Sequence, residues 1–373
     1  MGEFPVSLRD DPIILFRGRM PVARPEVRWS TNLEEDDRTV KLSLDSIGYG
    51  GYFTAPGERL DLEGAMRRAA QFGYDAVCVY AHRPVGFPMD IGAERRRRLR
   101  ELARELDLEF GAVVCCTNFQ EANHVLIYPQ EKEILYVRTA IDLASDLGAG
   151  VVRVLAAFYG YFQNPLAAQG YGAPAFESRS RRVSRNEDFL DAWRQVRRGL
   201  TEVARYAEDK GIVLALQTHP EITGNNEETL AMIEEVGVGS LKVGLDLPLF
   251  ENFDSGFVRR TVHSMKGLMV YSHTISLAKS YTVGGAPYSW EEVTPGSERD
   301  TLPWEVFLEA CRDIGYGGYL SHEQCSPILV KGHKLGGLDT VDARYIEAHR
   351  FFRGMLGKLN CYSGHKPAPA AVR

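Results

Sequence analysis

The sequence predicts an α/β protein folded as a (β/α)₈ barrel. Two observations predict it: short β-branched apolar runs recur along the chain, and charged stretches with helical apolar spacing separate them. Near-continuous apolar strands between amphipathic helices are typical of parallel strands that helices cover on the outside. Eight such units can close into a barrel, and a doubly wound open sheet is the alternative arrangement.

The predicted elements follow one another in strict alternation. The strands are Val40–Ile47, Asp75–Tyr80, Glu109–Cys116, Val151–Ala157, Ile212–His219, Leu241–Leu247, Leu268–Ile275 and Gly317–Cys325. The helices between them are predicted at residues 62–73, 94–107, 131–150, 189–211, 226–237, 253–267 and 303–315. Glycines mark several helix ends, as in the sequences AQFGYD and DLGAGV.

Three parts of the chain are expected to differ in organisation. Residues 1–38 form an irregular N-terminal arm, residues 39–330 the barrel, and residues 331–373 a C-terminal helix followed by a disordered tail. Long loops are predicted after strand four (158–186) and after strand seven (277–302). Both follow the carboxyl ends of strands, where barrel enzymes carry their active sites.

The composition narrows the class of protein. The chain has 373 residues, 44% of them hydrophobic and 25% charged, with a formal net charge of −6. A mild acidity argues against binding to nucleic acid, which favours a basic surface. We find no apolar run long enough for a membrane span and no signal peptide, so a cytoplasmic protein without a membrane partner is expected.

Polar side chains end the last four strands of the predicted barrel. Gln217, Asp246, His273 and Glu323 each follow an apolar run, and the carboxyl ends of barrel strands meet at one mouth. A single polar residue at such a place is commonplace, but four on successive strands indicate a site. Carboxylate, imidazole and amide oxygen donors suit Mn²⁺ best, with Mg²⁺, Co²⁺ or Zn²⁺ as alternatives.

In these residues the chain resembles the xylose isomerase-like barrel family, which includes sugar-phosphate isomerases and epimerases. The phrases LALQTHPE, VGLDLPLF and YLSHEQC carry the resemblance, which extends over about residues 38–330. The family places Glu, Asp, His and Glu on strands five to eight, and these positions match Gln217, Asp246, His273 and Glu323. The resemblance implies a metal-dependent enzyme that acts on a carbohydrate.

Two departures from the family pattern matter for chemistry. Gln217 stands where the family has a glutamate, and a glutamine can ligate a metal but cannot act as a base. Leu249 stands where the family often has a further histidine, which argues against an endonuclease-like site with several metals. Glu323, His219 and His82 are therefore the predicted catalytic groups; His219 shares the facing of Gln217 if the strand extends that far.

The predicted reaction begins with removal of a proton next to a carbonyl group of a sugar, keto sugar or polyol. Reprotonation would give an isomerase or epimerase, and loss of a β-substituent a dehydratase or another lyase. One alternative is the catalytic subunit of a C-glycoside deglycosidase, a branch that resembles this family and acts on 3-oxo-glucosides with a small partner subunit. A non-catalytic barrel subunit is the alternative of another class, with Gln217 as its best support.

The long loops supply the predicted substrate contacts. Tyr159, Phe162 and Tyr171 follow strand four and could stack on a sugar or an aromatic aglycone, or simply anchor the loop. Lys279 lies in the loop after strand seven and is also assigned to substrate binding. The expected partners are a small carbohydrate or glycoside and further copies of the chain, with a small partner subunit as a further option.

Overall fold

The computed structural model describes residues 39–120, 128–157, 189–219, 222–280, 289–332, 334–364 and residue 366. All of them belong to one of the two units into which the chain divides, Leu33–Arg373. The predicted arm at residues 1–38 and most of the loop after strand four lie outside the described residues.

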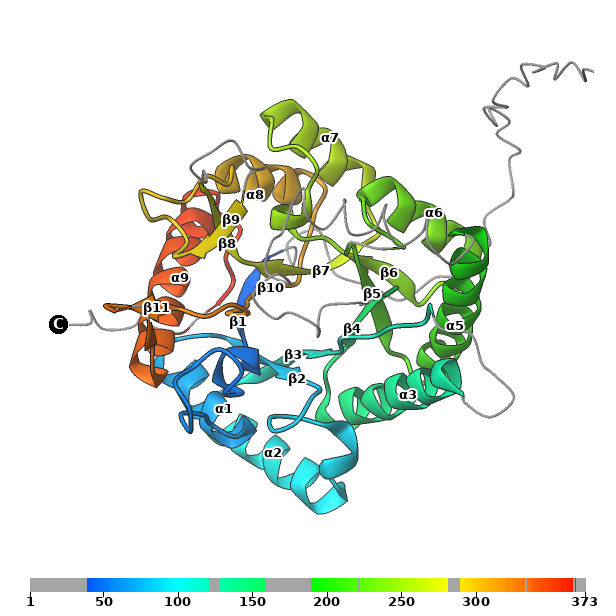
Figure 1. Cartoon of the computed structure of the whole chain (residues 1–373), viewed down its shortest axis with the longest axis horizontal. Coiled ribbons are helices and arrows are strands. Elements are labelled where there is room, and N and C mark those ends of the chain that lie inside the picture. Colours follow the sequence, from blue (N-terminus) through cyan, green and yellow to red (C-terminus); the bar gives the residue numbers. More distant parts are fainter. Residues whose placement is uncertain are drawn as a thin grey trace, which may run out of the picture. The chain divides into compact units, whose positions relative to one another are not determined.

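Eight parallel strands form a closed barrel, which confirms the predicted fold class (Figure 1). They are β1 (Lys41–Asp45), β2 (Ala76–Tyr80), β3 (Glu109–Val114), β4 (Val151–Leu155), β5 (Val213–Gln217), β6 (Leu241–Gly244), β7 (Met269–Thr274) and β10 (Tyr319–His322). The order around the barrel is β1-β10-β7-β6-β5-β4-β3-β2, so the first strand pairs with the last. Each strand coincides with one of the predicted apolar runs.

Helices surround the barrel on the outside (Figure 1). They are α1 (Leu62–Gln71), α2 (Ala93–Glu105), α3 (Pro129–Leu147), α5 (Phe189–Asp209), α6 (Asn226–Val236), α7 (Ser255–Ser264), α8 (Trp304–Asp313) and α9 (Leu338–Lys358). Local chemistry sets their ends: the Asp61 carboxylate accepts the Gly64 N–H at the start of α1. Gly148 and Gly237 end α3 and α6 with a positive φ that suits glycine.

The inside of the barrel is filled by a small buried cluster of Cys78, Ala112, Val114, Ala215 and Tyr271. The Tyr271 hydroxyl on β7 lies 3.4 Å from the Cys78 sulfur on β2, and these strands are not neighbours, so the cluster spans the interior. The larger hydrophobic core lies between the strands and the helices. The barrel is therefore packed from within, and the residues above this cluster form the floor of its mouth.

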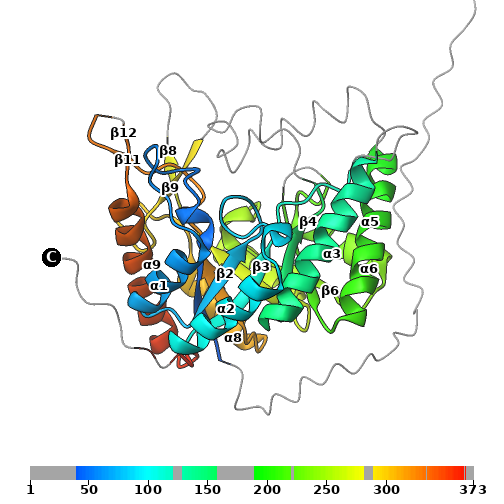
Figure 2. The ribbon, with the colours of Figure 1, turned by 90° about the horizontal axis from the view of Figure 1, so that it is seen from below.

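Two small antiparallel hairpins rise from one end of the barrel (Figure 2). One joins β8 (Ser276–Ser280) to β9 (Ser289–Val293), directly after β7; the other joins β11 (Leu329–Val330) to β12 (Lys334–Leu335), after β10. Short 3-10 helices follow β1 and β6, namely η2 (Ser46–Tyr49) and η4 (Leu247–Leu249), and η3 (Pro88–Asp90) precedes α2. The segment predicted as an irregular loop after strand seven therefore contains regular structure.

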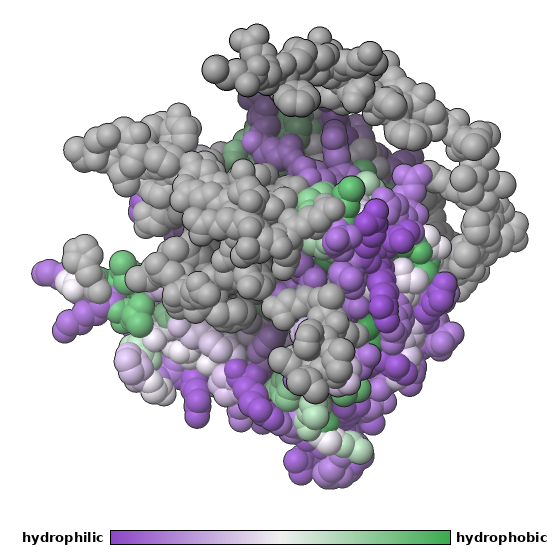
Figure 3. Space-filling model, turned by 45° about the vertical axis from the view of Figure 1, so that its right-hand side comes forward, coloured by the Kyte–Doolittle hydropathy of each residue, from purple (hydrophilic) through white to green (hydrophobic). Residues whose placement is uncertain are grey.

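On the face drawn in Figure 3, the visible surface of the described part is mostly hydrophilic, with small apolar patches. Leu135 on α3 and Leu190 on α5 are among the exposed apolar side chains. No helix in the described ranges has the length and apolarity that a membrane crossing requires.

Candidate functional site

The four residues predicted from the strand ends lie at one mouth of the barrel. Gln217 is the last residue of β5, and Asp246 lies two residues beyond β6. His273 is the penultimate residue of β7, and Glu323 directly follows β10. All four are buried, with exposed fractions between 0 and 5%. Burial of this many polar groups indicates that they interact with one another, with an ion or with a ligand.

His273 is the centre of the group. Its Nδ1 atom lies 3.6 Å from Asp246 Oδ2, 3.5 Å from Glu323 Oε2 and 3.4 Å from the Gln217 amide nitrogen. The backbone N–H of His273 also donates to Asp246 Oδ1 at 2.7 Å. The structure therefore brings all four predicted ligands around one imidazole edge.

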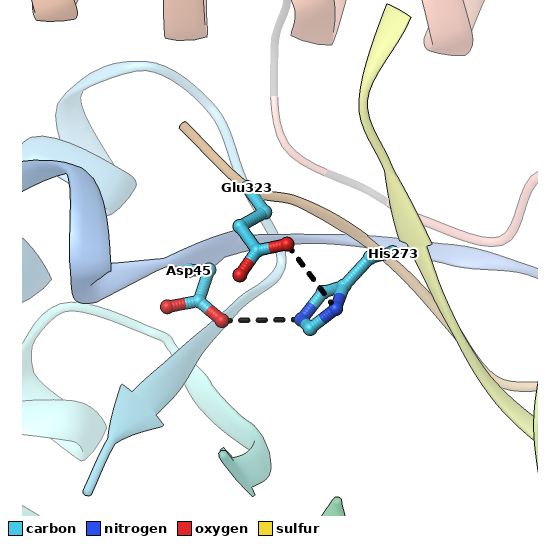
Figure 4. Close-up of side chains that lie close together, drawn as sticks. All are labelled: Asp45, His273 and Glu323. Atoms are coloured by element: carbon cyan, nitrogen blue, oxygen red, sulfur yellow. Dashed lines mark hydrogen bonds and ion pairs between the residues drawn. The ribbon is translucent and has the colours of Figure 1, made fainter. Parts of the chain in front are cut away.

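A fifth residue, Asp45 at the end of β1, faces the opposite edge of that imidazole (Figure 4). Its Oδ2 atom lies 3.2 Å from His273 Nε2, and the Tyr271 hydroxyl lies 2.9 Å from the same nitrogen. Asp45, His273 and Glu323 each offer a ligand atom within 4.8 Å of the others. The sequence analysis missed Asp45 because it applied the strand-end rule only to strands five to eight, although Asp45 ends an apolar run in the same way.

Gln217 is only partly satisfied in its buried position. Its amide nitrogen donates to Asp246 Oδ2, whereas its Oε1 atom is buried and has no hydrogen-bond partner within the described ranges. An unpartnered buried oxygen costs free energy unless a donor or a cation binds there. The Gln217 side chain therefore fits a place in a metal shell as a neutral oxygen ligand.

The carboxylates control the charge of the imidazole. Burial opposes a positive charge on His273, but Glu323, Asp246 and Asp45 outweigh it and raise the pKa of His273 to about 10. Burial also raises the pKa of Glu323, against the charges of His273 and Arg153 that lower it. Without a metal, the imidazole is thus a cation held by three carboxylates.

Arg153 on β4 is a second residue that the sequence analysis missed. Its side chain is 4% exposed, and its NH2 atom lies 3.7 Å from Glu323 Oε1. Its NH1 atom donates to the Cys115 carbonyl oxygen at 2.9 Å. The signal in the sequence was a single charge inside the otherwise apolar strand VVRVL.

The β2–β3 side of the mouth is aromatic and holds the predicted catalytic residue His82. Its Nε2 atom accepts the Cys116 N–H at 3.2 Å and lies 3.1 Å from the Tyr136 hydroxyl. The ring lies between those of Tyr80 and Tyr136, with centroids 4.8 and 5.5 Å away. Burial, followed by the charge of Arg153, lowers the pKa of His82 to about 4, so this imidazole is neutral near pH 7.

The alternation argument for His219 does not hold, because β5 ends at Gln217, two residues earlier. The His219 N–H donates to the Thr223 carbonyl oxygen at 3.0 Å, and the residue is buried at 6% exposure.

His322 lies on the outer side of β10, where its Nδ1 donates to the Thr274 carbonyl oxygen at 2.7 Å. Tyr159, Phe162, Tyr171 and the side chain of Lys279 lie outside the described residues.

The donor set fits one divalent ion. Nδ1 of His273 and oxygens of Asp246 and Glu323 converge. The amide of Gln217 lies beside them and would offer its unpartnered Oε1 after a flip about its last bond. Asp45 and Tyr271 contact the other nitrogen, as outer partners of metal-binding histidines do. This arrangement supplies both a ligand shell and a fixed orientation for the imidazole.

Comparison with known proteins places the chain in a family. The family model described as the xylose isomerase-like TIM barrel matches residues 66–354, and the chain belongs to this family. The fructoselysine 3-epimerases of Shigella flexneri and Escherichia coli O157:H7 are each 25% identical over 169 residues, which is 45% of this chain and 52% and 53% of those proteins. The chain therefore spans about half the length of the curated relatives it matches.

Solved structures share the fold at low sequence identity. The IOLI protein with a bound zinc atom has a TM-score of 0.61 at 14% identity, covering 85% of this chain and 98% of that chain. A D-psicose 3-epimerase in the presence of D-fructose has a TM-score of 0.59 at 15% identity, covering 85% and 99%. A xylose isomerase domain protein from Planctomyces limnophilus has a TM-score of 0.58 at 13% identity, covering 87% and 99%.

Proposed function

We propose that the protein is a divalent-metal-dependent isomerase or epimerase of keto sugars that removes a proton from the carbon next to a carbonyl group. The observation that carries this proposal is the convergence of Gln217, Asp246 and Glu323 on one edge of His273. The names of the epimerases that share sequence or fold with this chain support a carbohydrate substrate.

We assign the metal to Gln217, Asp246, His273 and Glu323, with Mn²⁺ as the preferred ion and Mg²⁺, Co²⁺ or Zn²⁺ as alternatives. When bound, the ion polarises the substrate carbonyl and stabilises negative charge on the neighbouring oxygen. Asp45 holds the imidazole through its far nitrogen, 3.2 Å away, so that Nδ1 stays directed at the carboxylates.

Glu323 is the base in this proposal. It lies at the mouth, is 5% exposed, and its two oxygens have different neighbours, His273 and Arg153. Gln217 cannot return a proton on the opposite face, so that role falls to His82 or His219. His82 is neutral near pH 7, so it could return only a proton that it had first accepted.

The charges of the described site favour an uncharged sugar over a sugar phosphate. Asp45, Asp246 and Glu323 are balanced by one divalent ion together with the Arg153 guanidinium, which leaves no excess positive charge for a phosphate. We therefore expect a free keto sugar or a neutral glycoside as substrate. Separately, we propose a cytoplasmic protein that forms a homo-oligomer.

The glutamine at position 217 favours one second candidate, a lyase. An epimerase with two opposed carboxylates can exchange protons on both faces, whereas a single carboxylate suffices to start an elimination. Loss of a β-substituent would make the protein a dehydratase, or a C-glycoside deglycosidase subunit that acts on 3-oxo-glucosides with a small partner subunit.

The test is proton exchange in D₂O, which detects the common first step. Protein loaded with Mn²⁺ is incubated with D-fructose, D-psicose, D-tagatose, fructoselysine or a 3-oxo-glucoside, and NMR follows deuterium incorporation and new products. Exchange with an epimer as product supports the epimerase, and a released aglycone or water supports the lyase. A folded protein that binds Mn²⁺ without any exchange would contradict both, and one that binds no metal would favour a non-catalytic barrel subunit.

A further inference from the structure

Arg153 begins one layer below the candidate metal site. On β4 it pairs with Ala215 of β5, whereas Leu155 pairs with Gln217. Side chains two residues apart on a strand share a face, so the guanidinium must reach upward from the level of Ala215 to contact Glu323. On the adjoining strands its register partners are Val114 of β3 and Ala215 of β5, both members of the interior cluster.

The guanidinium is held by groups that directly follow β3. NH1 donates to the Cys115 carbonyl oxygen at 2.9 Å and lies 3.8 Å from the Cys116 sulfur. Nε is buried and has no hydrogen-bond partner in the described part of the chain. A buried arginine with an unsatisfied donor is costly, because an arginine cannot lose its proton to escape the cost. A hydrophobic residue would fill this place at least as well for stability alone.

The contact with Glu323 separates the two oxygens of that carboxylate. Oε1 faces the Arg153 NH2 atom at 3.7 Å, and Oε2 faces His273 Nδ1 at 3.5 Å. The side chains are 4% and 7% exposed, so water screens their attraction weakly. The two oxygens of Glu323 therefore have different cationic neighbours.

We propose that Arg153 is a positioning residue that orients Glu323, so that Oε2 faces the metal-binding edge of His273 and Oε1 faces the guanidinium. The catalytic consequence rests on the function proposed above, whereas the orientation of Glu323 does not. Arg153 is not a substrate-binding residue in this scheme, because it lies beneath the carboxylate and is already engaged by Cys115 and Glu323.

The experiment compares Arg153→Met, Arg153→Lys and a matched surface variant, Arg138→Met. Arg138 pairs with Glu202 at 3.9 Å, a similar distance, but the two side chains are 45% and 52% exposed. Each protein is loaded with Co²⁺, whose visible absorption reports the geometry of its ligands, and is then assayed for exchange in D₂O with D-tagatose and the other sugars named above.

We expect Arg153→Met to change the Co²⁺ spectrum and to lower kcat about 100-fold, the usual cost of a catalytic group displaced by an ångström, with KM within about threefold of wild type. Arg153→Lys should recover part of both properties, because it keeps the charge but lacks the planar fork. Arg138→Met should match wild type.

Four other outcomes are decisive. An unchanged spectrum with wild-type kcat in Arg153→Met would overturn the positioning role and leave the proposed function intact, as would a rise in KM alone. A changed spectrum without exchange by the wild type would sustain the positioning role and overturn the proposed function. Failure of the wild type to bind Co²⁺ would overturn the proposed function and the role of Arg153 in presenting Oε2 to a metal.

Discussion

The two sides of the barrel mouth hold histidines in opposite states. On the β1, β6, β7 and β10 side, three carboxylates surround His273 and raise its pKa to about 10 in spite of burial. On the β2–β3 side, His82 lies among tyrosine rings and a cysteine, and burial lowers its pKa to about 4. The same side chain is therefore a buried cation on one side and a neutral acceptor on the other.

The difference shows that burial alone does not set the charge of these imidazoles, because the carboxylates beside His273 outweigh the desolvation that keeps His82 neutral. Both imidazoles lose most of their solvent, yet only His273 has carboxylates within 4 Å. A cation, whether a proton or a metal, is stable only on that charged side. The other side brings together the rings of Tyr80, Tyr136 and His82.

The largest expected effect, a loss of metal affinity, comes from Asp246→Asn, which removes one of the three carboxylates around His273. Asp246 accepts the His273 N–H and faces its Nδ1, so the amide should keep the fold but lose at least about 100-fold in metal affinity. Elemental analysis and titration calorimetry would measure it, with Asp313→Asn on the surface of α8 as the control. Tight binding of Mn²⁺ by Asp246→Asn would refute the ligand assignment.

The next effect is a dependence of metal binding on pH. In the metal-free protein the pKa of His273 is raised from 6.5 to about 10, so the imidazole is protonated up to about pH 10. The protonated imidazole therefore contributes its full stabilisation of the fold below about pH 6.5, and this contribution is lost as pH rises toward 10. A metal must displace that proton, so affinity should rise up to about tenfold per pH unit between pH 7 and 9.

Calorimetry in buffers of different ionisation enthalpy should then detect about one proton released from His273 per ion bound. His82→Asn should leave the pH dependence of metal affinity unchanged, because the His82 imidazole is already neutral between pH 7 and 9. If binding releases no proton at pH 7, the raised pKa of His273 is wrong.

A smaller effect is expected from Gln217→Glu, which makes the charged side more like the family pattern. Without metal, a fourth carboxylate should lower the free energy of unfolding by about 1–3 kcal/mol at pH 8. With Mn²⁺ it should increase the affinity about tenfold, because an anionic ligand replaces a neutral one. Thermal unfolding with and without Mn²⁺ would show both changes. Gln217→Met should not show the increase in Mn²⁺ affinity. Equal affinity of Gln217→Glu and wild type would show that residue 217 does not ligate.

The smallest effect is expected from Tyr80→Phe on the aromatic side. The hydroxyl lies 3.7 Å from the Cys116 sulfur, a weak contact, so its removal should raise KM by at most about threefold. Metal affinity measured on the same sample should equal that of wild type. A loss of metal from Tyr80→Phe would mean that the two sides of the mouth are not independent.

The sequence predicted the barrel well because each strand is a nearly continuous apolar run between helical stretches. It also predicted four residues of the candidate site, because a polar group after such a run is visible without knowing the register. Asp45 was missed because the strand-end rule was applied only to strands five to eight. In the structure its carboxylate also accepts the Ile47 N–H at the start of η2, as a helix-capping residue does.

The other misses depend on geometry that spacing does not carry. Whether Arg153 points into the barrel or toward the helices depends on the register of β4, which the pattern VVRVL leaves open. The position of His219 depends on where β5 stops, at Gln217. The hairpin of β8 and β9 was not predicted, because β9, with the sequence SWEEV, contains no apolar run.

The contact between β1 and α9 has a consequence for how the protein is made. The Tyr345 hydroxyl on α9 donates to the Asp45 carbonyl oxygen at 2.6 Å and its ring stacks on Tyr49, although 300 residues separate the two hydrogen-bonded partners. During synthesis the first strand is translated early and α9 near the end, so the early segment must wait for its partner. A chain that stops before Tyr345 would therefore lack the hydrogen bond that holds the end of β1, next to the candidate site, and pulse proteolysis of such a truncated chain would detect the loosened segment.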